Sequence, residues 1–535
     1  MLQRAGKGLC VLLAGTGIAI ADEGGISSSE LELDGTGDIG GIAQWQVKEH
    51  PQPEPGDWQS LVSRTGENQR ISRHLGLETA AGISWLPKTV APEASHPPGA
   101  ASDRWVSADG NWQLERKLRQ SETAYRLELS IELSRLGNSR LPASNVAPLR
   151  LLLGPGLGER PMEGLGIATS LYSYVEPVIR IGDSTERIEL SEPGQSPTVP
   201  LRAATGETWF GLNSRYFAIL LEPASETGIN EVEFRLAVSP HPERLPDRYL
   251  PSLAVDLEVP QLSPGESARW QFEIFSGPKS RAALAGGPDA SDYTGVLFHS
   301  LWRWMRGLSF GLLRVLEWLY AIAHSWGIAI CLLAVLVRIL LYPFARWALS
   351  SQQKFSDVQR RIQPEMARIK AKYKGGKQSE RILKLYEKHG VSPLAGLKPL
   401  LIVLIQIPVF VALFHVLGQA FELRQASFLW MESLSEPDRL FAFGAELPFF
   451  GAYFNLLPVL MAISTLITIK LSPAPASSDA DSRRQNIFLG LMALTFFLLF
   501  YPFPSGMVLY WTIANALHIV QARITRPKEV EPDAS

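Results

Sequence analysis

Long apolar runs dominate the second half of the chain, whereas the first half alternates between apolar and polar positions. Five runs stand out, at residues 326–345, 399–420, 454–471, 487–501 and 506–524. A helix needs about 20 mostly apolar residues to cross a hydrocarbon core about 30 Å thick. The pattern therefore predicts a multi-span α-helical membrane protein with a five-span core, a large periplasmic antiparallel β-sandwich domain and a cytoplasmic helical hairpin.

The first run, WGIAICLLAVLVRILLYPF, contains one charged residue, Arg338. A guanidinium keeps its proton even in apolar surroundings, so its burial needs water, a counter-charge or carbonyl groups. In one interpretation Arg338 snorkels toward the nearer interface. The next basic residue, Arg346, lies eight positions on, which is about 12 Å along a helix. In the other interpretation Arg338 faces a wet cavity inside the membrane, and that cavity is the working site.

Segments with a period of two, such as RLELSIEL and EVEFRLAV, recur between Trp105 and Phe275 and indicate strands. Many strands without helical patterns between them predict an antiparallel sandwich at residues 61–290. Residues 1–21 begin with two basic residues and an apolar stretch of about 14 residues, which predicts a signal peptide or a first membrane anchor. Residues 22–60 are rich in Gly, Ser, Pro and acids, which predicts a linker.

Residues 297–324 change to a helical period. Their charged and histidine residues fall within a narrow arc, and the remaining surface is mostly Leu, Trp, Phe, Val and Ile. This pattern fits an amphipathic helix in a membrane interface. Trp302, Trp304 and Trp318 are of the type found at headgroup level.

The distribution of Lys and Arg predicts which segments lie on each side of the membrane. Residues 346–398 hold thirteen Lys and Arg against four acids, so the positive-inside rule places them in the cytoplasm. Their apolar positions step by three and four on both sides of Gly375 and Gly376, which predicts the helical hairpin. The other segments follow in alternation: 22–296 and the loop 421–453 in the periplasm, and the loop 472–486 and the tail 525–535 in the cytoplasm.

Composition and cysteine positions argue against disulfide, metal and catalytic sites. The 535 residues are 46% hydrophobic and 19% charged, with a net charge of −2. Cys10 and Cys331 each lie in an apolar stretch, so neither a disulfide framework nor a metal site is expected. The strand-rich half shows no catalytic constellation, and its spread carboxylates fit solvated faces of strands.

Polar residues are scattered within the apolar runs. Each is by itself more typical of an interhelical hydrogen bond than of a functional group, but together with Arg338 they could line one hydrophilic groove. These residues are Gln406, Thr465, Thr468, Trp511, Thr512, Asn515 and His518. No acid lies within the runs, which argues against a proton relay of carboxylates. It favours water or a passing polypeptide as the partner of Arg338.

Four motifs resemble the YidC/Oxa/Alb family of membrane protein insertases in its Gram-negative form. They are VRILLYP around Arg338, SPLAGLKPLLIVLIQIPVF from Ser392, FELRQASF from Phe421, and FPSGMVLYWTIAN from Phe503. The resemblance covers residues 326–524. It implies a groove open to the cytoplasm and to lipid, with Arg338, Gln406, Trp511 and Asn515 as groove or substrate-contact residues. It implies no nucleotide, no metal and no other cofactor, and a multi-pass protein of the bacterial inner membrane.

The chain departs from the family pattern in three places. About three residues are added before Gln406, which is nearly one helical turn and puts the cytoplasmic end of that span in doubt. Ala334 lies one turn before Arg338, where a polar residue is often found, so the groove is expected to be less polar there. The amino terminus looks cleavable, whereas the family type usually keeps it as an anchor.

The function that follows is that of an insertase and not of an enzyme. A polar segment of a nascent membrane protein would shed only part of its water in the groove, and its apolar segment would then enter lipid, gaining about 25 cal/mol per Å² of buried apolar area. Arg338 would attract acidic or polar residues of the translocated tail. The alternative from another class is a secondary transporter for an anionic solute, with Arg338 as the anion site. It is disfavoured because no inverted repeat is evident.

The expected partners are nascent membrane proteins and the lipid bilayer. The positive charge of residues 346–398 has two interpretations: a topology signal alone, or a docking surface for RNA or an acidic protein. In the second, the Sec translocon, the ribosome and the signal-recognition machinery are the candidate partners, and the protein could work alone or with the translocon. No DNA binding is expected.

Overall fold

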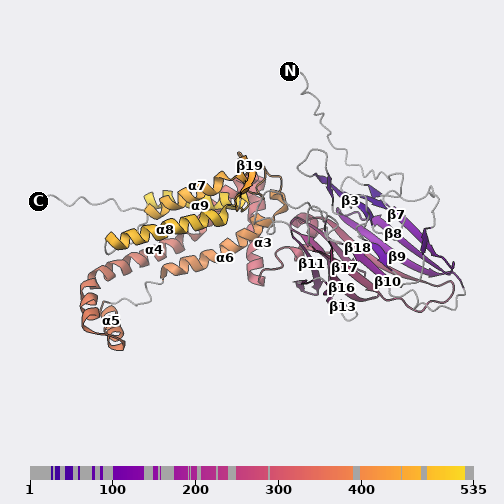
Figure 1. Ribbon diagram of the computed structural model, residues 1–535, viewed down its shortest axis with the longest axis horizontal. Helices are drawn as coiled ribbons and strands as arrows, with labels where there is room; N and C mark the ends of the chain where they lie inside the picture. Colours follow the sequence, from indigo (N-terminus) through magenta and orange to yellow (C-terminus); the bar gives the residue numbers. More distant parts are fainter. Residues whose placement is uncertain are drawn as a thin grey trace, which may run out of the picture. The chain divides into compact units, whose positions relative to one another are not determined.

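The computed structural model contains two compact units, one ending at Ser300 and the other beginning at Leu301. Figure 1 shows strands in the first and helices in the second. The structure describes residues 26–27, 31–35, 42–51, 58–60, 75–78, 85–87, 100–137, 149–154, 157, 174–190, 192, 194–201, 207–224, 227–238, 249–286, 290–389, 398–447, 449–471 and 479–524. The expected leader or anchor 1–21, the tail 525–535 and parts of the expected hairpin and cytoplasmic loop, 390–397 and 472–478, lie outside them.

Residues 22–60 contain strands, which corrects the prediction of a linker. Strands β1 (Ile26–Ser27), β2 (Leu31–Gly35), β3 (Ile42–Pro51) and β4 (Trp58–Ser60) form one antiparallel sheet in that order. In the register of this sheet Leu31 is the backbone partner of Val47, and Leu33 is the partner of Trp45. Composition predicts a linker because Gly, Ser and Pro between the strands dominate the segment and mask the alternation of apolar and polar residues within the strands.

The rest of the first unit confirms a large antiparallel β-sheet domain. A nine-stranded sheet runs in the order β12-β11-β14-β15-β18-β9-β8-β7-β6, and a five-stranded sheet runs β13-β16-β17-β10-β5. The strands are β5 (Gly76–Glu78), β6 (Trp85–Pro87), β7 (Ala100–Ser107), β8 (Trp112–Gln120), β9 (Arg126–Arg135), β10 (Leu149–Leu153), β11 (Val175–Ile181), β12 (Ser184–Arg187), β13 (Thr198–Pro200), β14 (Thr208–Ser214), β15 (Phe217–Pro223), β16 (Ile229–Val238), β17 (Tyr249–Leu257) and β18 (Ser267–Pro278).

The core of this unit lies where the two sheets meet, since β17 of the smaller sheet contacts β11 and β14 of the larger one. Along β9, Leu127, Leu129 and Ile131 are buried and alternate with more exposed residues. Successive side chains of a strand point to opposite faces, so alternation of this kind buries one face of the sheet.

A buried arginine holds the end of the first unit against its sheet. Arg126 is fully buried and ion-paired with Glu273, and its guanidinium lies 4.6 Å from the centre of the Tyr293 ring. The Tyr293 hydroxyl donates to Glu273 at 3.1 Å. Glu222 of β15 lies directly opposite Glu273 of β18 in the sheet register. Burial raises the pKa of Glu222, and the negative charges of Glu273 and Glu207 raise it further. The segment after β18, with α2 (Arg281–Ala285) and the short helix η3 (Thr294–Val296), is thereby fixed.

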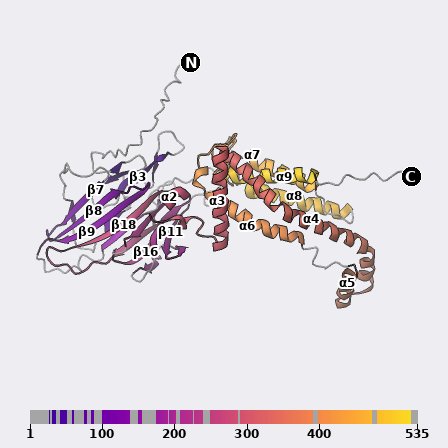
Figure 2. The ribbon, with the colours of Figure 1, turned by 180° about the vertical axis from the view of Figure 1, so that it is seen from behind.

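The second unit is helical. Its helices are α3 (Arg303–Ala323), α4 (Trp326–Lys372), α5 (Gly376–Lys388), α6 (Lys398–Gln419), α7 (Leu456–Leu471), α8 (Asp479–Phe500) and α9 (Ser505–Ile524). Helix α9 packs against α7, α4 and α6, helix α3 packs against α4 and α6, and α7 packs against α8. Figure 2 shows the same arrangement from behind. Each of the five apolar runs therefore lies mostly within a helix that contacts at least one other.

One stretch of the described residues, Trp326–Phe344 of α4, is long and apolar enough to cross a membrane by length and hydropathy. Shorter apolar stretches lie in α6, α7 and α8: Gln406–Gln419, Leu456–Thr468 and Gly490–Phe500. Helix α4 continues without a break for 47 residues, with Pro343 and Pro364 inside it. The first predicted span and the first arm of the predicted hairpin are thus a single helix.

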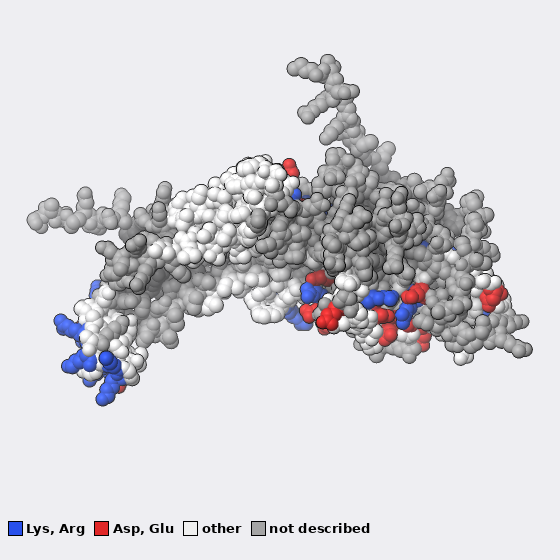
Figure 3. All heavy atoms as spheres, viewed as in Figure 1, with Lys and Arg blue, Asp and Glu red and all other residues white. Residues whose placement is uncertain are grey.

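The tip of the helical hairpin is strongly basic. After α4, Gly375 takes a positive φ of 65°, and α5 begins at the next residue. Leu385 of α5 and Ile362 of α4 are buried, whereas the basic side chains around them are exposed. Figure 3 shows these basic residues gathered at one end of the second unit. The exposed ones are Arg361, Arg368, Lys372, Lys374, Lys377, Arg381, Lys384 and Lys388.

Candidate functional site

Arg338 lies half-buried in the apolar part of α4, where that helix packs against α9. Its Nε donates a hydrogen bond to the side-chain oxygen of Gln521, at 3.2 Å. Leu336 and Leu340, two residues away on either side, are exposed. These neighbours lie about 200° around the helix at 100° per residue. One face of α4 is therefore apolar and open, and the guanidinium is on the face toward α9.

Gln521 is a partner that the sequence analysis missed. Water or a passing polypeptide was expected, because no acid lies in the spans. The signal was the row Thr512, Asn515 and His518, which continues by the same step of three to Gln521. Each step of three turns a helix by about 60°. A row of this kind winds around α9, so its members face different neighbouring helices instead of one groove.

Asn515 lies on the part of α9 that faces α7. Its amide nitrogen donates to the hydroxyl of Thr465 at 2.9 Å and to that of Ser464 at 3.3 Å. Both hydroxyls in turn donate to the carbonyl of Met461. Interhelical bonds of this type stabilise helix packing within a membrane. The structure thus gives Asn515 a packing role between α7 and α9.

Trp511 belongs to an aromatic cluster. Its ring lies 5.3 Å from that of Phe410 in α6 and 5.6 Å from that of Phe500 at the end of α8. Gln406 lies four residues before Phe410 on α6 and is half-buried. Residues four apart lie on the same face of a helix. Within the described part of the chain no hydrogen-bond partner of Gln406 is seen.

The four predicted residues therefore lie on three helices that pack together, but they are not in one row. Arg338 faces the Gln521 end of α9, Asn515 faces α7, and Trp511 with Gln406 belongs to the side of α6. Among the described residues no group of three His, Cys, Asp or Glu could hold a metal ion.

The family model and the curated relatives indicate the same family. The family model described as "60Kd inner membrane protein" matches residues 318–531. Membrane protein insertase YidC of Anaeromyxobacter sp. (strain K) is 30% identical over 463 residues, which cover 85% of this chain and 74% of that protein. The chain belongs to the YidC family of membrane protein insertases. The relative from Syntrophobacter fumaroxidans is 30% identical over 395 residues, 71% of this chain and 66% of its own length.

A solved YidC structure, titled "Active YidC insertase crystal structure with the first transmembrane domain resolved", is also similar. It is 18% identical, covers 96% of this chain and 95% of its own, and superposes with a TM-score of 0.35. The family relationship confirms the resemblance seen in the motifs and identifies an inner membrane protein. Members of this family are named as insertases, not as enzymes, and the comparisons do not favour the anion-transporter alternative.

Proposed function

We propose that this protein inserts nascent membrane proteins into the inner membrane through a hydrophilic groove built around Arg338. The observation that carries the proposal is the position of Arg338 in an apolar helix of a YidC-family protein, with a neutral amide as its hydrogen-bond partner. An amide oxygen accepts one of the five guanidinium N–H groups and cancels none of the charge. The remaining charge can attract acidic residues of a client.

The proposed topology has five spans, in α4, α6, α7, α8 and α9. It is supported by large apolar side chains that these helices leave exposed, which in water would be an unusually large apolar surface. Examples are Ile339 of α4, Ile407 of α6, Ile463 of α7, Leu491 of α8 and Val520 of α9. The exposed basic residues of the hairpin favour a cytoplasmic position for that end, by the positive-inside rule. Residues 22–296 then lie in the periplasm.

In the proposed mechanism a client enters from the cytoplasmic side. A polar segment exchanges part of its water for the side chains of Arg338, Gln521 and Gln406, and Trp511 and Asn515 border the path. The flanking apolar segment then partitions into lipid, which supplies about 25 cal/mol per Å² of buried apolar area. No covalent bond changes, so the groove acts only by lowering the cost of dehydrating the polar segment.

The basic hairpin offers a second contact. Its exposed Lys and Arg residues, among them Arg361 and Arg368, form a positive surface suited to RNA or an acidic protein. The ribosome, the signal-recognition machinery and the Sec translocon are the proposed partners. Replacing both residues by Glu should reduce ribosome co-sedimentation without removing the protein from the membrane. Unchanged association would leave the charge as a topology signal.

The test of the function is depletion of this protein, followed by protease protection of small membrane proteins with short translocated tails. After depletion the tails should stay accessible in the cytoplasm, and wild-type protein supplied in trans should restore their translocation. Normal insertion in the depleted cells would refute the proposal. A loss of uptake of one anionic solute without an insertion defect would support the transporter alternative.

A further inference from the structure

A two-stranded hairpin stands at the end of the helices opposite the basic hairpin. Strand β19 (Phe441–Leu447) pairs with β20 (Gly451–Phe454), and only Asn455 separates β20 from α7. Four large apolar side chains of this segment are exposed: Leu440, Phe441, Phe443 and Leu447. The Phe441 ring stacks on that of Phe454, with centres 5.0 Å apart. Clusters of exposed large apolar side chains mark contact with a partner or a membrane, so the exposed face needs an occupant.

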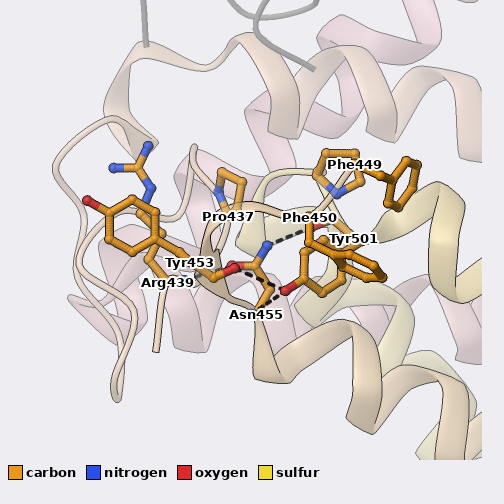
Figure 4. Close-up of a pocket in the computed structure, with 8 residues that line it drawn as sticks. Pro437, Arg439, Phe449, Phe450, Tyr453, Asn455 and Tyr501 are labelled. Atoms are coloured by element: carbon orange, nitrogen blue, oxygen red, sulfur yellow. Dashed lines mark hydrogen bonds between the residues drawn. The ribbon is translucent and has the colours of Figure 1, made fainter. Parts of the chain in front are cut away.

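The hairpin is built firmly onto the helices. The carboxylate of Asp438 accepts hydrogen bonds from the backbone N–H groups of Leu456 and Leu457, at 2.8 and 2.9 Å, and caps α7. Asn455 donates to the carbonyl of Tyr501 at 2.9 Å, and the Tyr501 hydroxyl donates to the carbonyl of Tyr453 at 3.0 Å. Figure 4 shows Tyr453, Asn455 and Tyr501 at the small pocket at the base of the hairpin. The exposed side chains therefore have a fixed position relative to α7.

The apolar face continues along α7. Leu460, Ile463 and Ile467 of that helix are exposed as well, and they would face lipid in the five-span arrangement proposed above. Between residues 440 and 454 the only charged residue is Glu446. An apolar, aromatic segment that leads directly into such a helix has the character of a membrane-interface segment.

The backbone of the β19–β20 hairpin limits how deeply it can enter a bilayer. The register shifts between Ala442 and Leu447, so residues 443–446 have no cross-strand partner in the described ladder. Backbone N–H and C=O groups outside a ladder need water, which the hydrocarbon core does not offer. Arg439, at the base of the hairpin, places its guanidinium 5.1 Å from the centre of the Tyr453 ring and pairs with Glu436 at 3.0 Å. Both charges need headgroups or water around them.

We propose that the β19–β20 hairpin is seated in the periplasmic leaflet of the bilayer, with Phe441 and Phe443 at the boundary of headgroups and acyl chains and Arg439 at the level of the phosphates. The occupant of the exposed face is thus phospholipid. The inference rests on the proposed five-span topology. In this position the hairpin would hold the outer ends of α7 and α8 at a fixed depth while clients pass.

The test uses the full chain, with Cys10 and Cys331 replaced by Ser, in vesicles of phosphatidylethanolamine and phosphatidylglycerol. A nitrobenzoxadiazole dye is attached to one new cysteine in each variant: Phe443→Cys, Ala442→Cys, Ile463→Cys or Glu192→Cys. Ala442 is the matched control, since adjacent residues of a strand point to opposite faces. Ile463 reports on the span in α7, and Glu192 is an exposed residue of the β-sheet domain. Leu447→Cys replaces Phe443→Cys if that variant does not fold.

The dye at position 443 should emit at shorter wavelength than the dye at 192. A nitroxide lipid labelled near the headgroup should quench it at least about twofold more than one labelled at the chain end, because interfacial segments lie only about 5–10 Å deep. Iodide should quench the dye at 442 more than the dye at 443. Quenching of the 443 dye by iodide and not by lipid would overturn the inference.

The 463 dye separates this failure from failure of the topology. If lipid nitroxides quench the 463 dye but not the 443 dye, the span in α7 stands and the seated hairpin is wrong. If they quench neither, the five-span proposal itself fails. Protection of the 443 dye that depends on the ratio of protein to lipid would identify a second copy as the occupant. Protection in native membranes but not in vesicles would identify a protein partner. Either result would overturn the lipid assignment.

Discussion

The two units treat a buried arginine in opposite ways. In the β-sheet domain, Arg126 and Arg116 are almost fully buried, and each is paired with a carboxylate, Glu273 and Asp103. In the helical unit, Arg338 is half-buried and hydrogen-bonded to the neutral Gln521. Removing a charge from water is costly unless a partner compensates it. In the β-sheet domain the arginine charge is neutralised within the fold and stabilises it. The charge of Arg338 is not neutralised by Gln521 and is free to attract a transient ligand.

The largest effect is expected in the β-sheet domain. Arg126→Ala removes the ion pair with Glu273 and the contact with the Tyr293 ring, and should cost about 3 kcal/mol of stability. Arg119→Ala is the control, because that arginine is exposed and its pair with Glu128 is a surface pair worth under about 1 kcal/mol. Thermal unfolding in detergent, followed by circular dichroism of the strands, measures both. Equal shifts in the two variants would remove the contrast between buried and surface pairs.

For Arg338 the effect should fall on function and not on folding. A client carboxylate about 8 Å away gains about 2 kcal/mol at an effective dielectric constant of about 20, so Arg338→Ala should slow insertion of acidic-tailed clients by up to roughly thirtyfold. Arg338→Lys should retain part of the rate, since the charge remains. Protease protection of the tails measures the rate, and clients with neutral tails are the matched control. Normal insertion by Arg338→Ala would return Arg338 to the snorkelling interpretation.

A substitution at Gln521 can remove the difference between the charge of Arg338, which lies beside a neutral amide, and the carboxylate-paired charge of Arg126. Gln521→Glu would give Arg338 the carboxylate partner that Arg126 already has. We expect the new pair to compete with clients, so insertion of acidic-tailed clients should fall several-fold, by less than in Arg338→Ala. Gln521→Ala is the control, because it removes the hydrogen bond and adds no charge. If Gln521→Glu and Gln521→Ala behave alike, the charge of Arg338 is not what clients recognise.

The sequence predicted the elements better than the contacts between them. The alternation in β9 and the apolar run of α4 each reflect burial of one face or of a whole segment, which is a local pattern. The sheet of residues 22–60 was missed because three of its four strands have five residues or fewer and the Gly, Ser and Pro between them dominate composition. Gln521 and Thr465 were not recognised as partners of Arg338 and Asn515, because such pairs depend on how α9 is rotated between α4 and α7. No spacing along the chain specifies that rotation.

The stability of the β-sheet domain should also depend on pH, with a smaller effect than those above. Burial raises the pKa of Glu222 above its ordinary value of 4.5, so the folded state holds this proton more tightly than the unfolded state does. The stabilisation is complete below the ordinary pKa and is lost as pH rises through the raised one. Glu222→Gln should therefore gain in unfolding temperature relative to wild type as pH is raised from 4 to about 8. Glu192→Gln, at an exposed position, is the control. A difference that does not change with pH would contradict the prediction.

The smallest effect is expected at Asn515, and it separates packing from client contact. Asn515→Ala removes the hydrogen bonds to Thr465 and Ser464, and bonds of this type contribute about 0.6 kcal/mol on average. The variant should unfold slightly earlier in a detergent titration and insert clients at the wild-type rate. Thr512→Val is the control, since among the described residues the Thr512 hydroxyl donates to the carbonyl of Val508 in its own helix and to no neighbouring helix. If insertion falls in Asn515→Ala while stability does not, Asn515 contacts clients directly and is not only a packing residue between α7 and α9.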